Sequence, residues 1–211
     1  MAIACLHTAE SNVAVFDGAA AALGANLTHL VRADLLQAAE AAGGMTPAVA
    51  AKTAALLHRL AEGADAVLLT CSTLGPVAPE VASRTPVPVL RVDAALAREA
   101  LATGGRLAVL CAAATTVEPT RALFAAAAGG SQDKLDIRLV PGAWDAFKAG
   151  EIERYHALVA GAADAAYAAG AEVVALAQAS MAGAAALCRA GRPLTSPAAG
   201  LAAALQAAAA R

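Results

Sequence analysis

One segment of this chain occurs twice, and the repeat limits the folds that the sequence can adopt. Residues 63–73 read GADAVLLTCST, and residues 170–180, 107 positions later, read GAEVVALAQAS. In each copy a short apolar run leads into small polar residues, which is typical of a buried strand with polar side chains at its carboxyl end. The first copy carries Cys71 where the second carries Gln178.

Two further segments recur in the same order. Residues 2–8 match the residues from Leu107 onward, and 88–96 (PVLRVDAAL) match 193–201 (PLTSPAAGL), so the three landmarks share an offset of 105 to 107. In this alignment Cys5 and Cys111 occupy equivalent strand positions. Such a repeat predicts two similar structural halves.

Strand-like runs alternate with helical runs along the whole chain, which predicts parallel α/β layers. We expect two pseudo-symmetric, flavodoxin-like or Rossmann-like lobes with parallel sheets and a cleft between them. Lobe 1 comprises residues 1–96 plus 196–211, and lobe 2 comprises residues 97–195. Because ligands bind at the carboxyl ends of such strands, Cys71 and Gln178 are expected on opposite sides of the cleft.

The expected elements have the following bounds. Strands are expected at 2–6, 26–31, 67–71, 87–92, 107–111, 135–140 and 173–177, with an extended piece at 193–195. Helices are expected at 13–23, 35–42, 47–61, 77–83, 94–103, 119–128, 152–169, 183–189 and 201–210.

Composition excludes several classes of function. The net charge of −2 provides no basic stripe for nucleic acid. The longest uncharged run, 193–210, contains two prolines and a glutamine and is otherwise mostly alanine, which argues against a membrane span. The N-terminus lacks the positive charge of a signal peptide. The four cysteines show no CxxC spacing, so we expect reduced thiols in a cytoplasmic protein and no zinc site.

The motifs at the two repeated strand ends resemble those of the cofactor-independent aspartate/glutamate/hydantoin racemase superfamily. That superfamily also includes maleate isomerases and arylmalonate decarboxylases. The resemblance rests on TCST at 70–73, on LAQASMAG at 176–183 and on the segment 193–200, and it extends over nearly the whole chain. It implies a small carboxylate substrate and no cofactor or metal. Together with base rates, it also implies a homodimer or higher homo-oligomer.

In the two-cysteine racemases, the resemblance implies a thiolate on one face of the substrate and a thiol on the other. The first cysteine corresponds to Cys71. The second position holds Gln178, whose amide cannot act as a base. One-thiol protonation, isomerisation or lyase chemistry is therefore expected in preference to two-base racemisation. The single-cysteine decarboxylases keep the second cysteine, whereas this chain keeps the first.

Cys71 is the predicted catalytic residue. A free thiol with a pKa of about 8.5 is a few per cent thiolate at neutral pH, and a helix N-terminus facing it lowers that pKa. The alternative is a buried, inert cysteine that packs as a small hydrophobe. Core packing is the preferred interpretation of Cys5, Cys111 and Cys188.

Polar residues beside the two strand ends are candidate substrate ligands. Their hydroxyl and N–H groups bind carboxylates or enediolates, and the same residue types also cap helices. His7 either raises the thiolate fraction of Cys71 by ion pairing or is a solvated or satisfied histidine. Gln178 either orients the substrate or marks a lobe that has lost its chemistry. The candidate substrate ligands are His7, Thr8, Ser11, Ser72, Thr73, Thr115, Thr116, Ala179 and Ser180.

Three functions remain open from the sequence alone. The first is an enzyme that performs acid/base chemistry with Cys71 on a small carboxylate-bearing carbon acid. The second is a non-catalytic carboxylate-binding protein of the same fold. The third is a hydrolase with a Cys71–His7 pair. His29, His58 and His156 share no spacing, and we interpret them as surface or packing residues.

Overall fold

Each half of the chain builds one four-stranded parallel sheet flanked by helices, which confirms the predicted α/β class. The computed structural model describes residues 1–129 and 134–211. These divide into two compact units, Met1–Ala95 with Pro197–Arg211 (unit 1) and Leu96–Ser196 (unit 2). Within the described residues, no helix combines the length and apolar character needed to cross a membrane.

Unit 1 has the strand order β2-β1-β3-β4. The strands are β1 (Ala2–His7), β2 (Asn26–Val31), β3 (Ala66–Leu69) and β4 (Val89–Arg91). The helices are α1 (Ser11–Leu23), α2 (Ala33–Ala41), α3 (Pro47–Ala61), the 3₁₀ helix η1 (Gly75–Val77) and α4 (Ala78–Ala82). Two more helices, α5 (Val92–Ala102) and α9 (Ser196–Ala209), contribute residues to both units.

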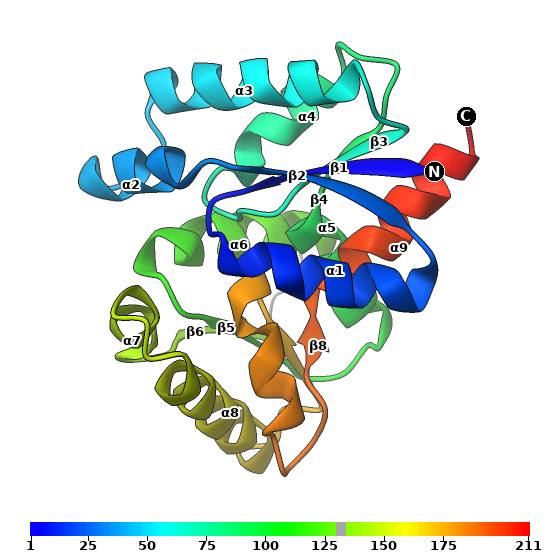
Figure 1. The fold of residues 1–211 in the computed structure, drawn as a ribbon. Coiled ribbons are helices and arrows are strands. Elements are labelled where there is room, and N and C mark those ends of the chain that lie inside the picture. Colours follow the sequence, from blue (N-terminus) through cyan, green and yellow to red (C-terminus); the bar gives the residue numbers. More distant parts are fainter. Residues whose placement is uncertain (130–133) are drawn as a thin grey trace. The chain divides into compact units, whose positions relative to one another are not determined.

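The two faces of the unit 1 sheet carry different side chains, because successive residues of a strand point to opposite faces. Ala4 and Leu6 belong to a core cluster with residues of α2, α3 and α4, including Leu57. Ile3, Cys5 and His7 alternate with them, and the ring of His7 lies 5.1 Å from that of Phe16 on α1. Figure 1 shows α3 and α4 on one side of this sheet and α1 on the other.

Unit 2 has the strand order β6-β5-β7-β8, which repeats the order of unit 1 and confirms the predicted pseudo-symmetry. The strands are β5 (Leu107–Cys111), β6 (Leu135–Leu139), β7 (Val173–Leu176) and β8 (Leu194–Thr195). The helices are α6 (Ala114–Ala127), α7 (Ala143–Lys148), α8 (Ile152–Ala168) and the 3₁₀ helix η2 (Ala179–Ala186).

Backbone pairing fixes the true alignment of the repeat and corrects one prediction. The N–H of Thr70 donates to Leu6 O, and the N–H of Ala177 donates to Leu110 O in the same way. Beyond these pairs, Arg32 N donates to His7 O and Val140 N donates to Cys111 O. The structural counterpart of Cys111 is therefore His7, and the predicted equivalence of Cys5 with Cys111 is wrong. A slip of two residues preserves the face of a strand, so the sequence pattern did not reveal it.

Two predicted element boundaries change the position of site residues. The strand expected to reach Cys71 ends at Leu69, so residues 70–73 form a loop after β3. The helix expected from Pro119 begins at Ala114, so Thr115 and Thr116 lie in its first turn. The helix expected at 183–189 is the 3₁₀ helix η2, and α7 was not predicted because six residues are too short for a visible period.

A buried ion pair lies beside the loop that follows β3. Arg91 donates from Nε to Asp93 Oδ1 at 2.9 Å and from Nη2 to Oδ2 at 2.7 Å. The two side chains are 12% and 2% exposed. A Cβ at Gly75 would lie 2.6 Å from the guanidinium of Arg91, so this glycine lets the ion pair pack against the loop.

We expect Asp93→Asn to lower the free energy of unfolding by about 3 kcal/mol, because it leaves the Arg91 charge buried without its partner. Urea denaturation measures this loss. The control is Glu80→Gln, which breaks the exposed Arg84–Glu80 pair and should cost less than about 1 kcal/mol. Equal losses in the two variants would contradict the assigned role of the buried pair.

Candidate active site

The thiol of Cys71 lies in the loop after β3 and is held by a set of hydrogen-bond donors. The residue is only 8% exposed. Burial is the main influence on its pKa and raises it, and the negative charge of Asp93 also raises it. Hydrogen bonds from the Thr8 hydroxyl and the backbone N–H groups of Leu74 and Thr73 lower the pKa without offsetting burial. Cys71 is therefore a protonated thiol whose thiolate, once formed, would meet three donors.

Some of the other predicted residues of unit 1 lie next to this thiol, and one does not. Thr8, Ser72 and Thr73 are buried next to it, at 7%, 3% and 3% exposure. Ser11, by contrast, is exposed at the first position of α1.

Asn12 is a polar residue of this region that the sequence analysis missed. It lies on α1, and its N–H donates to Ala9 O just as that of Thr116 donates to Ala113 O in unit 2. The side chain is 6% exposed, and within the described residues its Oδ1 atom has no hydrogen-bond partner. The corrected repeat would have pointed to Asn12, because this residue is the counterpart of Thr116.

His7 does not pair with the Cys71 thiol. Its Nδ1 lies 2.8 Å from Thr70 Oγ1, and its Nε2 lies 2.8 Å from His29 Nδ1. Burial, followed by the neighbouring His29, lowers the pKa of His7 to about 4, against the opposing effect of Asp17. The imidazole is therefore neutral at pH 7, and neither the predicted ion pair nor a Cys71–His7 hydrolase dyad fits these contacts.

A histidine interpreted as a surface or packing residue belongs to this network. His29 pairs with Cys5 across the β1–β2 ladder, and its Nε2 lies 3.0 Å from Asp17 Oδ1. The ligand atoms of Cys5, His7 and His29 all lie within 4.8 Å of one another, a grouping that metal ions also use. Sequence spacing did not reveal it, because the cluster depends on the register between two strands.

In unit 2, Gln178 occupies the position that corresponds to Cys71. Its Oε1 accepts hydrogen bonds from Ala112 N at 2.5 Å and Ala113 N at 3.0 Å, just before α6. The Thr116 hydroxyl lies farther away, at 3.5 Å. The side chain therefore satisfies two backbone donors with its own oxygen.

The remaining predicted residues of unit 2 mostly make contacts within that unit. The Thr116 hydroxyl donates to Ala113 O at 2.6 Å, and α6 begins without a side-chain cap, so the helix-capping alternative is not borne out. The Ser180 hydroxyl lies 2.8 Å from the Tyr155 hydroxyl, and burial raises the pKa of that tyrosine. Ala179 is buried and Thr115 is half-buried. Tyr155 is a further neighbour that the sequence analysis missed, because it lies on α8, distant in the chain.

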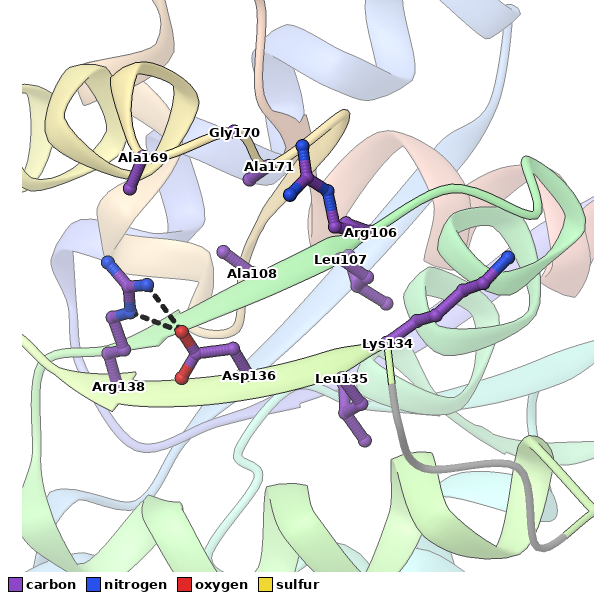
Figure 2. A pocket seen from close by; sticks show the side chains of 10 residues that line it. All are labelled: Arg106, Leu107, Ala108, Lys134, Leu135, Asp136, Arg138, Ala169, Gly170 and Ala171. Carbon is purple, nitrogen blue, oxygen red and sulfur yellow. Dashed lines mark hydrogen bonds and ion pairs between the residues drawn. The ribbon is translucent and has the colours of Figure 1, made fainter.

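A separate cavity of about 160 Å³ opens at the other edge of the unit 2 sheet. Figure 2 shows its lining: Arg106 lies at the start of β5, Lys134 and Leu135 at the start of β6, and Gly170 before β7. These are amino-terminal strand ends, whereas ligands of parallel sheets bind at carboxyl ends. We therefore do not assign this cavity to the site around Gln178.

Cys71 should react with iodoacetamide at least about tenfold more slowly than free cysteine at pH 7, because burial reduces both thiolate and access. Its rate should keep rising at pH values where the rate of free cysteine has levelled off. Thr8→Val should slow labelling further by removing a donor to the thiolate. Mass spectrometry of the Cys71 peptide measures each rate.

The control for this measurement is Thr53→Val, which removes a hydroxyl that donates to Val49 O within α3. It should leave the profile unchanged. Rapid labelling of Cys71 at pH 7, with a plateau below the pKa of free cysteine, would contradict the protonated state.

Comparisons with known proteins agree with this architecture. A family model described as Asp/Glu/Hydantoin racemase matches residues 6–205. Allantoin racemase from Klebsiella pneumoniae is similar in structure, with TM-score 0.71, 16% identity and coverage of 100% of this chain and 88% of that one.

Glutamate racemase from Thermus thermophilus gives TM-score 0.69 at 18% identity, covering 99% of this chain and 80% of that one. Arylmalonate decarboxylase gives TM-score 0.61 at 18% identity, covering 99% of this chain and 92% of that one. A search of curated proteins found no match. These structural likenesses establish the fold, and the family model establishes the relationship. The chain belongs to the Asp/Glu/hydantoin racemase family.

Proposed function

We propose that this racemase-like enzyme uses the thiol of Cys71 to protonate the enediolate of a small carboxylate-bearing carbon acid and uses no cofactor. The observation that carries the proposal is the buried thiol of Cys71 with three hydrogen-bond donors around it. In the step, the S–H bond breaks and the electron pair of an enediolate forms the new C–H bond. The thiolate left behind is stabilised by Thr8 and by the N–H groups of Thr73 and Leu74.

Donors beside the thiol are suited to hold the substrate carboxylate. Ser72 and Thr73 follow Cys71 directly, and hydroxyl and backbone N–H groups are the usual ligands of carboxylates and enediolates. Asn12 adds a buried acceptor oxygen that has no hydrogen-bond partner among the described residues. An unpaired buried acceptor is unfavourable, so a substrate with an N–H or O–H group on or near the reacting carbon would satisfy it.

Gln178 is proposed to orient the substrate through its amide N–H₂ group. An amide does not exchange protons as a base, so a second proton transfer would need water or another group. Decarboxylation followed by protonation, or isomerisation, is therefore favoured over strict two-base racemisation. That Cys71 and Gln178 act on one substrate molecule is inferred from their equivalent places in the repeat and from the family.

A carboxylate-binding protein without catalysis is the remaining alternative. It shares the donors around Cys71 and differs only in never exchanging the α-proton. The Cys71–His7 hydrolase is not favoured, because both nitrogens of His7 lie against Thr70 and His29.

The setting of the enzyme is also part of the proposal. All four cysteines are free, which supports a reducing compartment, and we propose the cytoplasm. A homodimer or higher homo-oligomer is proposed from the family and from base rates. Sedimentation equilibrium of the purified chain tests it, and a monomer at all accessible concentrations would refute it.

Incubation with a panel of small carboxylic acids and hydantoins in deuterium oxide should reveal at least one substrate that gains deuterium at carbon. Malonates, which form an enediolate by losing carbon dioxide, belong in the panel. Cys71→Ala should reduce the rate at least about 100-fold, because it removes the acid. Cys111→Ala, which removes a buried thiol from unit 2, should not. If every ligand that binds fails to gain deuterium, the non-catalytic alternative is favoured.

Two substitutions separate the structural and chemical roles of Gln178. Gln178→Glu keeps an acceptor for Ala112 N and Ala113 N, so stability should change by less than about 1 kcal/mol. It removes the amide donor and adds a negative charge, so turnover of a carboxylate should fall at least about tenfold. Unchanged turnover would contradict the donor role.

Gln178→Cys should create or increase racemisation of whatever substrate the protein binds. Chiral chromatography of the recovered substrate measures this. If racemisation does not increase while the Cys71-dependent reaction persists, the two positions do not act on the same carbon.

A further inference from the structure

Three side chains with metal-binding atoms converge on one face of the unit 1 sheet. Cys5 and His7 are two residues apart on β1, and His29 is the β2 partner of Cys5. Cys5 and His7 have no exposed surface, and the side chain of His29 is 16% exposed. Strand alternation and parallel pairing therefore place one thiol and two imidazoles together.

The fold itself does not require polar residues at these positions. In the repeat register, the counterparts of Cys5, His7 and His29 are Val109, Cys111 and Ile137 of unit 2. There the same positions are filled by hydrophobic side chains and one thiol. Burying two imidazoles instead is unfavourable unless their nitrogens have partners. Packing alone therefore does not explain the two histidines of unit 1.

The outward nitrogens of both rings contact side-chain oxygens. His7 Nδ1 lies 2.8 Å from Thr70 Oγ1, a hydroxyl that also lies 3.0 Å from Leu6 O. His29 Nε2–H donates to the carboxylate of Asp17. Such outer partners fix the orientation of metal-ligating histidines and their tautomer.

This arrangement leaves the inward nitrogens facing each other. His7 Nε2 and His29 Nδ1 lie 2.8 Å apart, close enough for the N–H of one ring to donate to the other or, after a small opening, for both nitrogens to bind one metal ion. A shared proton satisfies them, and so does a metal ion. The buried Cys5 thiol favours the metal ion over the proton. Cys5, His7 and His29 each place a ligand atom within 4.8 Å of the other two, whereas a shared proton binds only two atoms.

We propose that Cys5, His7 and His29 bind one divalent transition-metal ion of the zinc or cobalt type, with Asp17 as the outer partner of His29. Two imidazoles and one thiolate form a ligand set that such ions favour, with a fourth position left for water. On binding, the S–H bond of Cys5 breaks, the metal–sulfur bond forms and the proton leaves to the buffer. The thiolate and Asp17 together balance the two charges of the ion.

The geometry needs only a small adjustment. Tetrahedral sites with metal–nitrogen distances of about 2.0–2.1 Å and metal–sulfur distances of about 2.3 Å separate their ligand atoms by about 3.3–3.6 Å. The present separations extend from 2.8 Å to at most 4.8 Å, so the imidazoles open slightly and the thiol approaches. Side-chain rotations suffice for movements of this size.

Cobalt titration of the untagged, full-length protein, freed of metal with a chelator and kept reduced by a phosphine, tests the proposal. One Co²⁺ per chain should bind with the visible bands of tetrahedral cobalt and a thiolate-to-cobalt charge-transfer band in the near ultraviolet. Zinc should displace it. Cys5→Val and His29→Ile, which install the residues of unit 2, should abolish the charge-transfer band and the tight binding, respectively.

Asp17→Asn should weaken cobalt binding by about 10- to 100-fold, the usual effect of losing an outer partner. The controls are Cys111→Ala and His58→Gln, which remove a buried thiol of unit 2 and a histidine of α3, and both should leave the spectrum unchanged. Thermal unfolding followed by circular dichroism shows whether each variant is folded.

Two results would overturn the proposal. One is a wild-type protein that binds no cobalt, in which case the two histidines share a proton. The other is a charge-transfer band that survives in a folded Cys5→Val variant. The wild-type result does not depend on the stability of any variant, and neither readout depends on the activity proposed for Cys71.

Discussion

Parallel pairing of the first and third strands of each unit is the constraint on which both candidate regions depend. The bond from Thr70 N to Leu6 O brings the loop after β3 next to the loop after β1, and Ala177 N with Leu110 O does the same in unit 2. Residues more than 60 positions apart in the chain thereby lie together at the carboxyl ends of the strands, where the following helices begin. The chemistry of each unit then depends on which side chains those two loops carry.

The two units use the same backbone arrangement for different purposes. In unit 1 the loops bury a thiol among donors, and burial keeps its proton in place against those donors. In unit 2 a glutamine oxygen takes the backbone donors directly. We propose Cys71 for proton delivery because of this balance between desolvation and hydrogen bonding, and not because of the identity of the thiol alone.

The sequence predicted what depends on local pattern and missed what depends on register. The bounds of β2, α3 and β5 agree with the prediction, because each element coincides with one local apolar or helical run. The equivalence of Cys71 with Gln178 rested on a whole segment, and pairing supports it. Cys5 and Cys111 were matched two residues out of register, since a shift of two keeps the face. The contacts of His7 with His29, and of Ser180 with Tyr155, follow from strand pairing and helix packing that spacing does not encode.

The oxygen of Gln178 has a consequence for which ligand groups unit 2 can accept. A ligand oxygen that approached Ala112 N and Ala113 N would compete with an acceptor tethered to the same chain, at an effective concentration that no free metabolite matches. The two backbone donors of unit 2 are thus already occupied, and a ligand group that needs them must first displace the Gln178 oxygen. Glutamine at this position therefore restricts which ligand groups the backbone of unit 2 can bind, in addition to lacking a basic atom.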